Sequence, residues 1–317
     1  MISEIGDLPW LGGSPEEWLS EVRAFVEPHA RGELELVQAR PWAVVLSAPA
    51  AGGRVFFKAS APGGRHEPAL VEALGRAFPD LVPAPIDAAP SRGWLLLPDC
   101  GRKLREARDE TGAVELWREL LPRYAEFQRA ALPEVGRWLR TGVPDRSPAR
   151  LPRLLAGLLD GPLMREAGVA GAELAELRAL APELEAACAE LGELGVSLDH
   201  GDLHDGNVLV QNGSAWLLDW ADACVSHPFV SLGVTCRSVA PAHTAALRDA
   251  YLEPWTADLA RPALLEAFAR AQWVALVGRA LDWAWMLGGT GTPARREWLP
   301  RVALWLRAWA AREEVVG

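Results

Sequence analysis

Lysine is nearly absent from this chain of 317 residues: of its 32 basic residues, only Lys58 and Lys103 are lysine. We attribute the arginine bias to the coding composition of the source genome, so a lysine that persists raises a question about its role. Long apolar runs are also missing. No stretch of ~18 residues is free of charges, and the sequence therefore predicts no membrane span.

The chain has a formal charge of −10 and no long basic run. Nonspecific binding to nucleic acid requires Lys and Arg to neutralise phosphates, so we expect no nucleic-acid partner. The four cysteines are widely spaced and form no CxxC pair, which is typical of reduced thiols. The first twenty residues carry no Lys or Arg and do not resemble a secretory signal. We therefore expect a cytoplasmic protein.

The first hundred residues predict a small unit of helices and strands. Ser14, Pro15 and Glu17 form a capping box at the start of a helix over 14–30. Alternating and apolar segments predict short strands over 34–38, 42–47 and 54–58. A helix over 67–77 and a buried strand over 93–98 follow.

Beyond Gly101 the pattern is mainly helical, with one β island at 208–218. Apolar spacing predicts helices over 116–127, 174–191, 261–287 and 296–312, the second bent or split at Pro182. A segment rich in Pro and Arg, 141–153, reads as a connector. The sequence thus predicts an α+β fold with a β-rich lobe, 1–100, and a larger helical lobe, 101–317.

A hairpin organises the most informative part of the chain. Asn212-Gly213 between two apolar runs predicts a two-residue type I′ turn. Such a turn pairs Gln211 with Ser214 and sets Asn207 opposite Leu218. Asp219 then follows one step beyond, so an amide and a carboxylate are expected together at the open end of the hairpin.

Oxygen-bearing side chains precede and close this hairpin. Hard cations such as Mg²⁺ prefer the ligands that Asn207 and Asp219 offer, with Asp202 in the loop before them. The order His200-x-Asp202-x-x-x-x-Asn207 is also typical of phosphoryl transfer. There, one aspartate orients the acceptor hydroxyl, while the asparagine and a second aspartate hold metal on the nucleotide phosphates.

The motif HGDLHDGNVL, followed by WLLDWADA within residues 196–222, resembles the catalytic region of the aminoglycoside phosphotransferase and choline kinase-like family. The resemblance implies a two-lobed protein-kinase-like fold with ATP, or GTP, and Mg²⁺ in the cleft. It assigns the catalytic base to Asp202 and the metal ligands to Asn207 and Asp219. It makes His200 a structural residue, and we place His204 in the same supporting role.

That reading requires a lysine at a strand end and a helical glutamate to pair with it. Lys58 ends a predicted strand, and Glu67 begins the next helix, with Glu72 as the spare candidate. We expect Lys58 to reach nucleotide phosphates as a compact cation. Near Leu97 and Asp99, main-chain groups are expected to bind the adenine edge.

Two positions depart from the expected pattern. The segment from Gln38 to Trp42 has no glycine, although protein kinases cover the phosphates with a G-x-G-x-x-G loop. This leaves the phosphate contacts of the loop unassigned. Ser231, in HPFVSLGV, stands where many relatives of the resembled family place an aspartate.

The acceptor is expected against the helical lobe, near Asp202. The negative charge of the chain suits a cationic acceptor such as an aminoglycoside, and fifteen tryptophans offer faces on which a ring or sugar can stack. The candidate residues for the acceptor site are Asp222, Tyr251, Trp255, Asp282 and Trp283, with Trp273, Arg279 and Trp285 beside them.

Two other classes of protein are weighed against a phosphotransferase. His200, Asp202, His204 and Asp205 resemble a binuclear metal hydrolase motif, but such sites need several further imidazoles, and the remaining histidines form no spaced pair. A kinase fold that binds without turnover is opposed by the filled catalytic positions. The sequence therefore predicts an ATP-dependent O-phosphotransferase, monomeric or homodimeric, acting on an antibiotic or on a choline-, sugar- or nucleoside-like metabolite.

Overall fold

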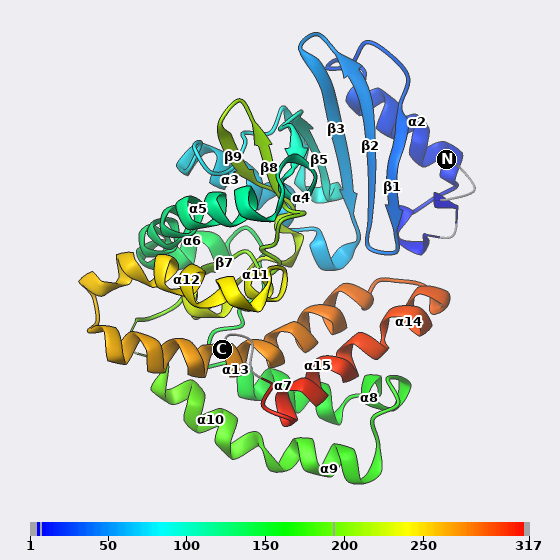
Figure 1. The fold of residues 1–317 in the computed structure, drawn as a ribbon. Helices are drawn as coiled ribbons and strands as arrows, with labels where there is room; N and C mark the ends of the chain where they lie inside the picture. Colours follow the sequence, from blue (N-terminus) through cyan, green and yellow to red (C-terminus); the bar gives the residue numbers. More distant parts are fainter. Residues whose placement is uncertain (1–4, 7, 193, 314–317) are drawn as a thin grey trace.

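An antiparallel sheet of five strands forms the smaller of two lobes (Figure 1). The computed structural model of the protein describes residues 5–6, 8–192 and 194–313. The strand order is β1-β2-β3-β5-β4. The strands are β1 Glu35–Arg40, β2 Ala43–Ala50, β3 Gly53–Ser60, β4 Asp87–Ala89 and β5 Trp94–Pro98.

Two helices cover this sheet on opposite faces. Helix α2, Pro15–Val26, begins at the predicted capping box, in which Ser14 Oγ accepts a hydrogen bond from Glu17 N at 3.2 Å. Successive side chains of a strand point to opposite faces, so on β5 Trp94 packs with α2 whereas Leu95 packs with α3, Glu67–Ala77. The inner face of β5 thereby joins the core of the helical lobe.

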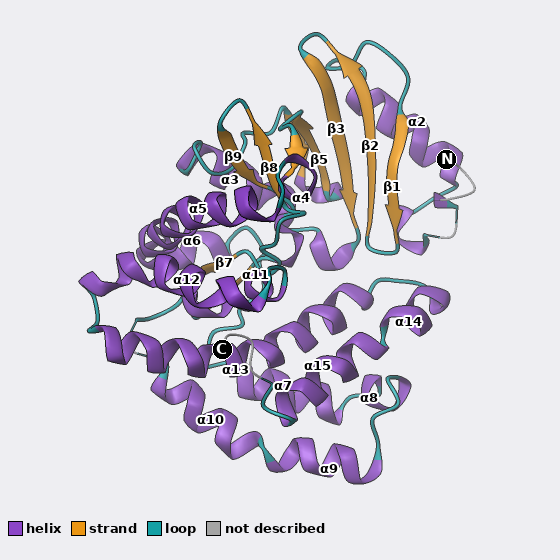
Figure 2. Ribbon diagram, viewed as in Figure 1, coloured by secondary structure: helices purple, strands orange, loops and turns teal. Residues whose placement is uncertain are grey.

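The larger lobe is mostly helical (Figure 2). The two long predicted helices at 174–191 and 296–312 each divide where a proline, Pro182 or Pro300, occupies the first turn of the second helix. The helices of this lobe are α4 Leu104–Ala107, α5 Glu110–Ala131, α6 Val135–Leu139, α7 Leu151–Asp160, α8 Leu163–Glu166, α9 Gly171–Ala179, α10 Ala181–Glu190, α11 Leu232–Arg237, α12 Pro241–Leu252, α13 Arg261–Leu287, α14 Thr292–Trp298 and α15 Pro300–Ala310.

The hairpin has the predicted register. Strands β8, Val208–Gln211, and β9, Ser214–Leu217, pair with Gln211 opposite Ser214. Asn212 and Gly213 take φ values of 52° and 82°, as a type I′ turn requires. Short strands that the sequence did not predict are β4, on β5; β6, Arg102–Lys103, on β8; and the pair β7, Ser197–Asp199, with β10, Cys224–Ser226.

The long helix α13 links the two lobes. Near its end, Trp285 Nε1 donates a hydrogen bond to the carbonyl of Gly63 in the small lobe at 2.8 Å. Trp42, in the turn between β1 and β2, packs edge-on against Trp283 and Trp298, whose rings are nearly parallel. Within the described residues, no helix combines the length and apolar character needed to cross a membrane.

Candidate active site

Lys58 lies between two carboxylates on the small-lobe side of the site. Its ammonium donates to Glu67 Oε1 at 2.8 Å and to Asp219 Oδ1 at 2.6 Å. Glu67 is only 1% exposed and also accepts hydrogen bonds from Ser60 Oγ and Trp220 N. The spare candidate, Glu72, instead pairs with Arg76 on its own helix. The cluster therefore joins β3, α3 and the end of the hairpin.

The charge on Lys58 is strongly favoured. Burial opposes an ammonium ion, but the attraction of Asp219 and Glu67 outweighs burial and raises the pKa of Lys58 above its usual value. The side chain is 12% exposed, and its hydrogen bonds to Glu67 and Asp219 hold the ammonium in a fixed direction. A compact, permanent positive charge in this place suits phosphate oxygens.

His200 ties the catalytic loop, between β7 and β8, to the hairpin. Its ring is fully buried, and burial lowers the pKa of the imidazole to about 4. A neutral ring has one donor and one acceptor, and both are used. Nε2 donates to the Leu218 carbonyl at 3.0 Å, and Nδ1 accepts from Asp202 N at 3.3 Å. The loop and the strand before Asp219 are thereby held together.

The two carboxylate oxygens of Asp202 face different neighbours. Oδ1 lies 3.2 Å from Arg279 Nη2, and Oδ2 lies 3.3 Å from His204 Nε2. Burial alone would raise the pKa of Asp202, but Arg279 and His204 lower it below its usual range. Asp202 is therefore ionised and oriented at neutral pH. His204 thus contacts this carboxylate directly.

Asn207 and Asp219 present donors that fit a hard cation. Asn207 Nδ2 donates to the Asp202 carbonyl at 2.9 Å, so the amide oxygen is the atom left for a ligand. Asp219 is 53% exposed at its side chain and takes a left-handed φ of 64°, which Asp tolerates better than most residues. An amide oxygen and a carboxylate are ligands that Mg²⁺ accepts.

The hinge between the lobes begins where β5 ends. Leu97 pairs with Phe56 of β3 and is 8% exposed. Asp99 Oδ1 accepts a hydrogen bond from Gly101 N at 2.9 Å, which closes a tight turn. Gly101 has φ 92°, and a Cβ there would lie 2.2 Å from the Val210 carbonyl, so only glycine fits. The main chain at Asp99 to Gly101 is thus fixed by this turn and by its close approach to β8.

Two of the predicted acceptor residues are wrong. Tyr251 and Trp255 are 0% exposed and lie in the core of the helical lobe, where the Tyr251 hydroxyl donates to the Pro228 carbonyl at 2.8 Å. The spacing of aromatic residues along a helix does not show whether they face the core or a ligand. Here these aromatic side chains face the core. Trp283 is half-buried and stacks on Trp298.

Asp222 and Asp282 both lie near Arg279. The Asp282 carboxylate is 3.4 Å from Arg279 Nη1 and also forms an ion pair with the buried Arg146. Asp222 is 4.0 Å from the same guanidinium. Burial, and then repulsion from Asp202, raise the pKa of Asp222 to about 6 despite Arg279.

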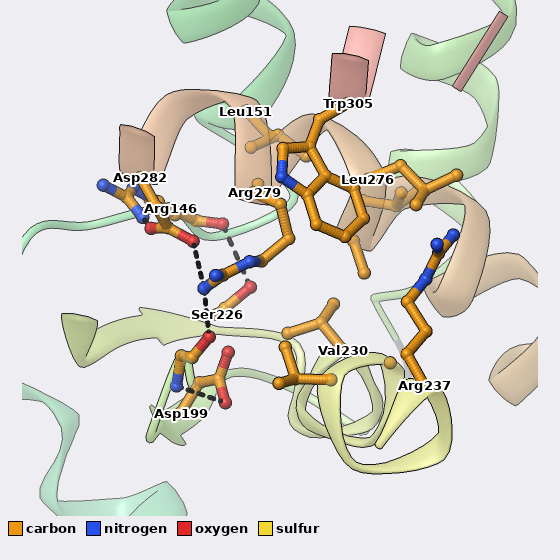
Figure 3. A pocket seen from close by; sticks show the side chains of 16 residues that line it. Arg146, Leu151, Asp199, Ser226, Val230, Arg237, Leu276, Arg279, Asp282 and Trp305 are labelled. Atoms are coloured by element: carbon orange, nitrogen blue, oxygen red, sulfur yellow. Dashed lines mark hydrogen bonds and ion pairs between the residues drawn. The ribbon is translucent and has the colours of Figure 1, made fainter. Parts of the chain in front are cut away.

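A narrow cavity of about 40 Å³ lies behind the catalytic loop (Figure 3). Figure 3 shows Arg279 and Trp305 lining it from the helical side and Asp199 from β7. This volume holds about two or three water molecules. The sequence did not single out Arg146 or Trp305: the first sits in the segment read as a connector, and the second in a helix read only as apolar.

A buried polar network lies beneath the loop and accounts for Ser231. The Ser231 hydroxyl donates to Asp199 Oδ1 at 2.5 Å, and Gly201 N donates to the same oxygen at 3.1 Å. Tyr124 OH and Gln128 Nε2 lie within hydrogen-bond distance of Ser231 Oγ. The carboxylate expected at position 231 is thus provided by Asp199, directly before the motif.

A protein-kinase-like fold, with a Lys–Glu pair in the small lobe and an Asp–Asn loop with a second Asp in the large lobe, defines a phosphotransferase. The chain belongs to the phosphotransferase enzyme family, whose model matches residues 17–265. The predictions of a two-lobed α+β fold and of a small-molecule kinase acting on a hydroxyl group are thereby confirmed.

Solved structures share this fold across most of their length. The macrolide 2′-phosphotransferase MphH from Brachybacterium faecium is 20% identical, with a TM-score of 0.57, covering 90% of this chain and 97% of its own. Choline kinase LicA from Streptococcus pneumoniae is 14% identical (TM-score 0.64; 92% and 99% covered). The GDP complex of aminoglycoside 2′-phosphotransferase-IIIa is also 14% identical (TM-score 0.61; 94% and 98%). The sequence matches none of the curated proteins with which it was compared.

Proposed function

We propose that the protein transfers the γ-phosphoryl group of ATP, with Mg²⁺, to a hydroxyl of a small natural product, with an antibiotic as the acceptor. The observation that carries the proposal is the pairing of Lys58 with Glu67 and Asp219, together with an ionised Asp202 held by Arg279. The GDP bound by aminoglycoside 2′-phosphotransferase-IIIa supports a purine nucleotide in the cleft.

In this mechanism Asp202 orients the acceptor hydroxyl for in-line attack on the γ-phosphorus. The new bond joins the acceptor oxygen to phosphorus, the bond to the β-phosphate oxygen breaks, and the hydroxyl proton moves toward Asp202. Lys58 attracts the phosphate oxygens. Asn207 Oδ1 and the Asp219 carboxylate would hold the metal, which neutralises charge on the phosphates.

The direct test is a screen for release of ADP from Mg·ATP and of GDP from Mg·GTP over macrolides, aminoglycosides, nucleoside and peptide antibiotics, choline and simple sugars. We expect turnover with an antibiotic. Turnover only with choline or a sugar would make the protein a metabolic kinase, and a failure to release nucleoside diphosphate with every acceptor tested would contradict the proposal. The choice between ATP and GTP follows from the same screen.

Asp202→Ala sharpens this test. We expect loss of transfer by ~10²–10⁴-fold, the contribution typical of a positioned acid or base, with nucleotide affinity retained. Asp160→Ala is the matched control, because Asp160 pairs with Arg178 at the surface and lies on α7, away from the loop. Undiminished turnover in Asp202→Ala would overturn the assignment.

We place the reaction in the cytoplasm. ATP is abundant there, and the four cysteines are buried and free, as a reducing compartment allows.

A further inference from the structure

Arg279 grips the catalytic loop at two points. From α13, its Nη1 donates to the Gly201 carbonyl at 2.6 Å, and its Nη2 donates to Asp202 Oδ1 at 3.2 Å. One planar guanidinium therefore contacts both the backbone before the catalytic residue and its carboxylate. A planar fork with fixed donors holds such a pair in one geometry better than an ammonium does.

The Arg279 guanidinium is itself held in place by an ion pair on the side away from the loop. Asp282, one turn further along α13, lies 3.4 Å from Arg279 Nη1 and also pairs with Arg146. Arg146 N donates to the Val225 carbonyl at 2.8 Å, which anchors it to β10. Charges thus alternate from Arg146 through Asp282 and Arg279 to Asp202. The Arg279 side chain is 15% exposed, so water competes little for these contacts.

The other carboxylate oxygen of Asp202 is held independently. Oδ2 lies 3.4 Å from Asn207 Nδ2 and 3.3 Å from His204 Nε2. An aspartate carboxylate turns readily about its last torsion, which has no narrow minima. Contacts on both oxygens remove this freedom, and Arg279 supplies the only one from outside the loop among the described residues.

We propose that Arg279 is a positioning residue for phosphoryl transfer, whose guanidinium fixes the orientation in which Asp202 meets the acceptor hydroxyl. The inference rests on the proposed function and goes beyond it, because it places part of the catalytic geometry on α13. Misplacement of a reacting group by about 1 Å can cost ~10²-fold in rate. The gripping contact therefore acts on kcat more than on nucleotide binding.

The test uses Arg279→Ala and Arg279→Lys in the full chain, with ADP release from Mg·ATP and the acceptor found in the screen, or with water as acceptor. We expect Arg279→Ala to lower kcat by ~10²-fold while KM for ATP stays within about threefold of wild type. Arg279→Lys retains the positive charge but not the planar fork, so its kcat should lie between those of wild type and Arg279→Ala. Added guanidinium ion, below denaturing concentrations, should restore a large part of kcat to Arg279→Ala.

Arg270→Ala is the matched control, since Arg270 lies on the same helix and pairs with Glu190 at the surface. It should lose no activity and show no response to guanidinium. A kcat of Arg279→Ala within threefold of wild type would overturn the proposal. A loss of kcat that guanidinium does not restore, accompanied by a lowered Tm, would make Arg279 a residue of folding alone.

A measurement without any acceptor separates this inference from the proposed function. The Tm shifts of Arg279→Ala and Asp202→Ala should not add in the double variant, because the two side chains interact directly. Additive Tm shifts would refute a direct interaction between Arg279 and Asp202. If no acceptor is phosphorylated and no ADP is released, but the shifts are non-additive, the proposed function fails while the contact between Arg279 and Asp202 stands.

Discussion

Exchanging the side chains at positions 199 and 231 tests how the catalytic loop is anchored. Asp199 accepts hydrogen bonds from Ser231 and from Gly201 N on one buried oxygen. A hydrogen bond to a charged group contributes about 1.5–3 kcal/mol, and relief from burying the charge offsets part of its loss. We therefore expect Asp199→Ser to lower the free energy of unfolding by ~2–4 kcal/mol.

Ser231→Asp alone sets two carboxylates against each other. At ~4 Å and an effective dielectric constant of ~20, their repulsion is ~4 kcal/mol, so one of them should become protonated. The double variant returns a single carboxylate to the network. Tyr124 OH and Gln128 Nε2 already lie 3.1 and 2.9 Å from the oxygen at position 231 and can donate to it.

We expect the exchange to recover at least ~2 kcal/mol relative to the sum of the single variants. Urea unfolding measures stability, and ADP release measures whether kcat recovers with it. Ser226→Asp combined with Asp199→Ser is the control, because Ser226 Oγ bonds to the Arg146 carbonyl and not to Asp199. Additivity within ~0.5 kcal/mol would refute the idea that the two positions share one carboxylate.

Three further predictions concern the cleft. Lys58→Arg should weaken nucleotide binding and lower kcat, because the larger fork does not fit between Glu67 and Asp219; unchanged values would leave the scarcity of lysine a matter of composition alone. Asp222 has a pKa raised to about 6, above the unfolded value of 3.8, so its ionisation destabilises the fold as pH rises through this window. Asp222→Asn should therefore raise the free energy of unfolding above pH 6 by at most ~3 kcal/mol, seen as a higher Tm in thermal scans, and the gain should vanish below about pH 4. Trp42→Ala removes the edge contacts to Trp283 and Trp298, worth about 0.5–1.5 kcal/mol each, and should speed nucleotide dissociation in stopped-flow experiments.

The parts of the site that local spacing determines could be predicted from the sequence. The turn at Asn212-Gly213 sets the register of the hairpin, and with it the approach of Asn207 to the strand before Asp219. Lys58 and Glu67 could be matched because one lies near the end of a strand, which runs on to Ser60, and the other begins a helix nine residues later. In each case a short-range rule restricts where the side chain can lie.

The parts that depend on how helices turn about their axes could not be predicted. Apolar spacing places Tyr251 and Trp255 on helical segments but leaves open which side meets the core, and both proved to be core residues. Arg146 shows a second limit. Its partner Asp282 lies far along the chain, and a Pro- and Arg-rich segment looks like a connector until β10 fixes it.

Helix α13 contacts both the small lobe and the loop that carries Asp202. Arg279 contacts the catalytic loop and pairs with Asp282 one turn further along, whereas Trp283 and Trp285 contact the small lobe. Residues three positions apart lie on the same face of a helix, whereas residues one or two positions apart lie on different faces. One helix therefore contacts both the small lobe and the loop that carries Asp202.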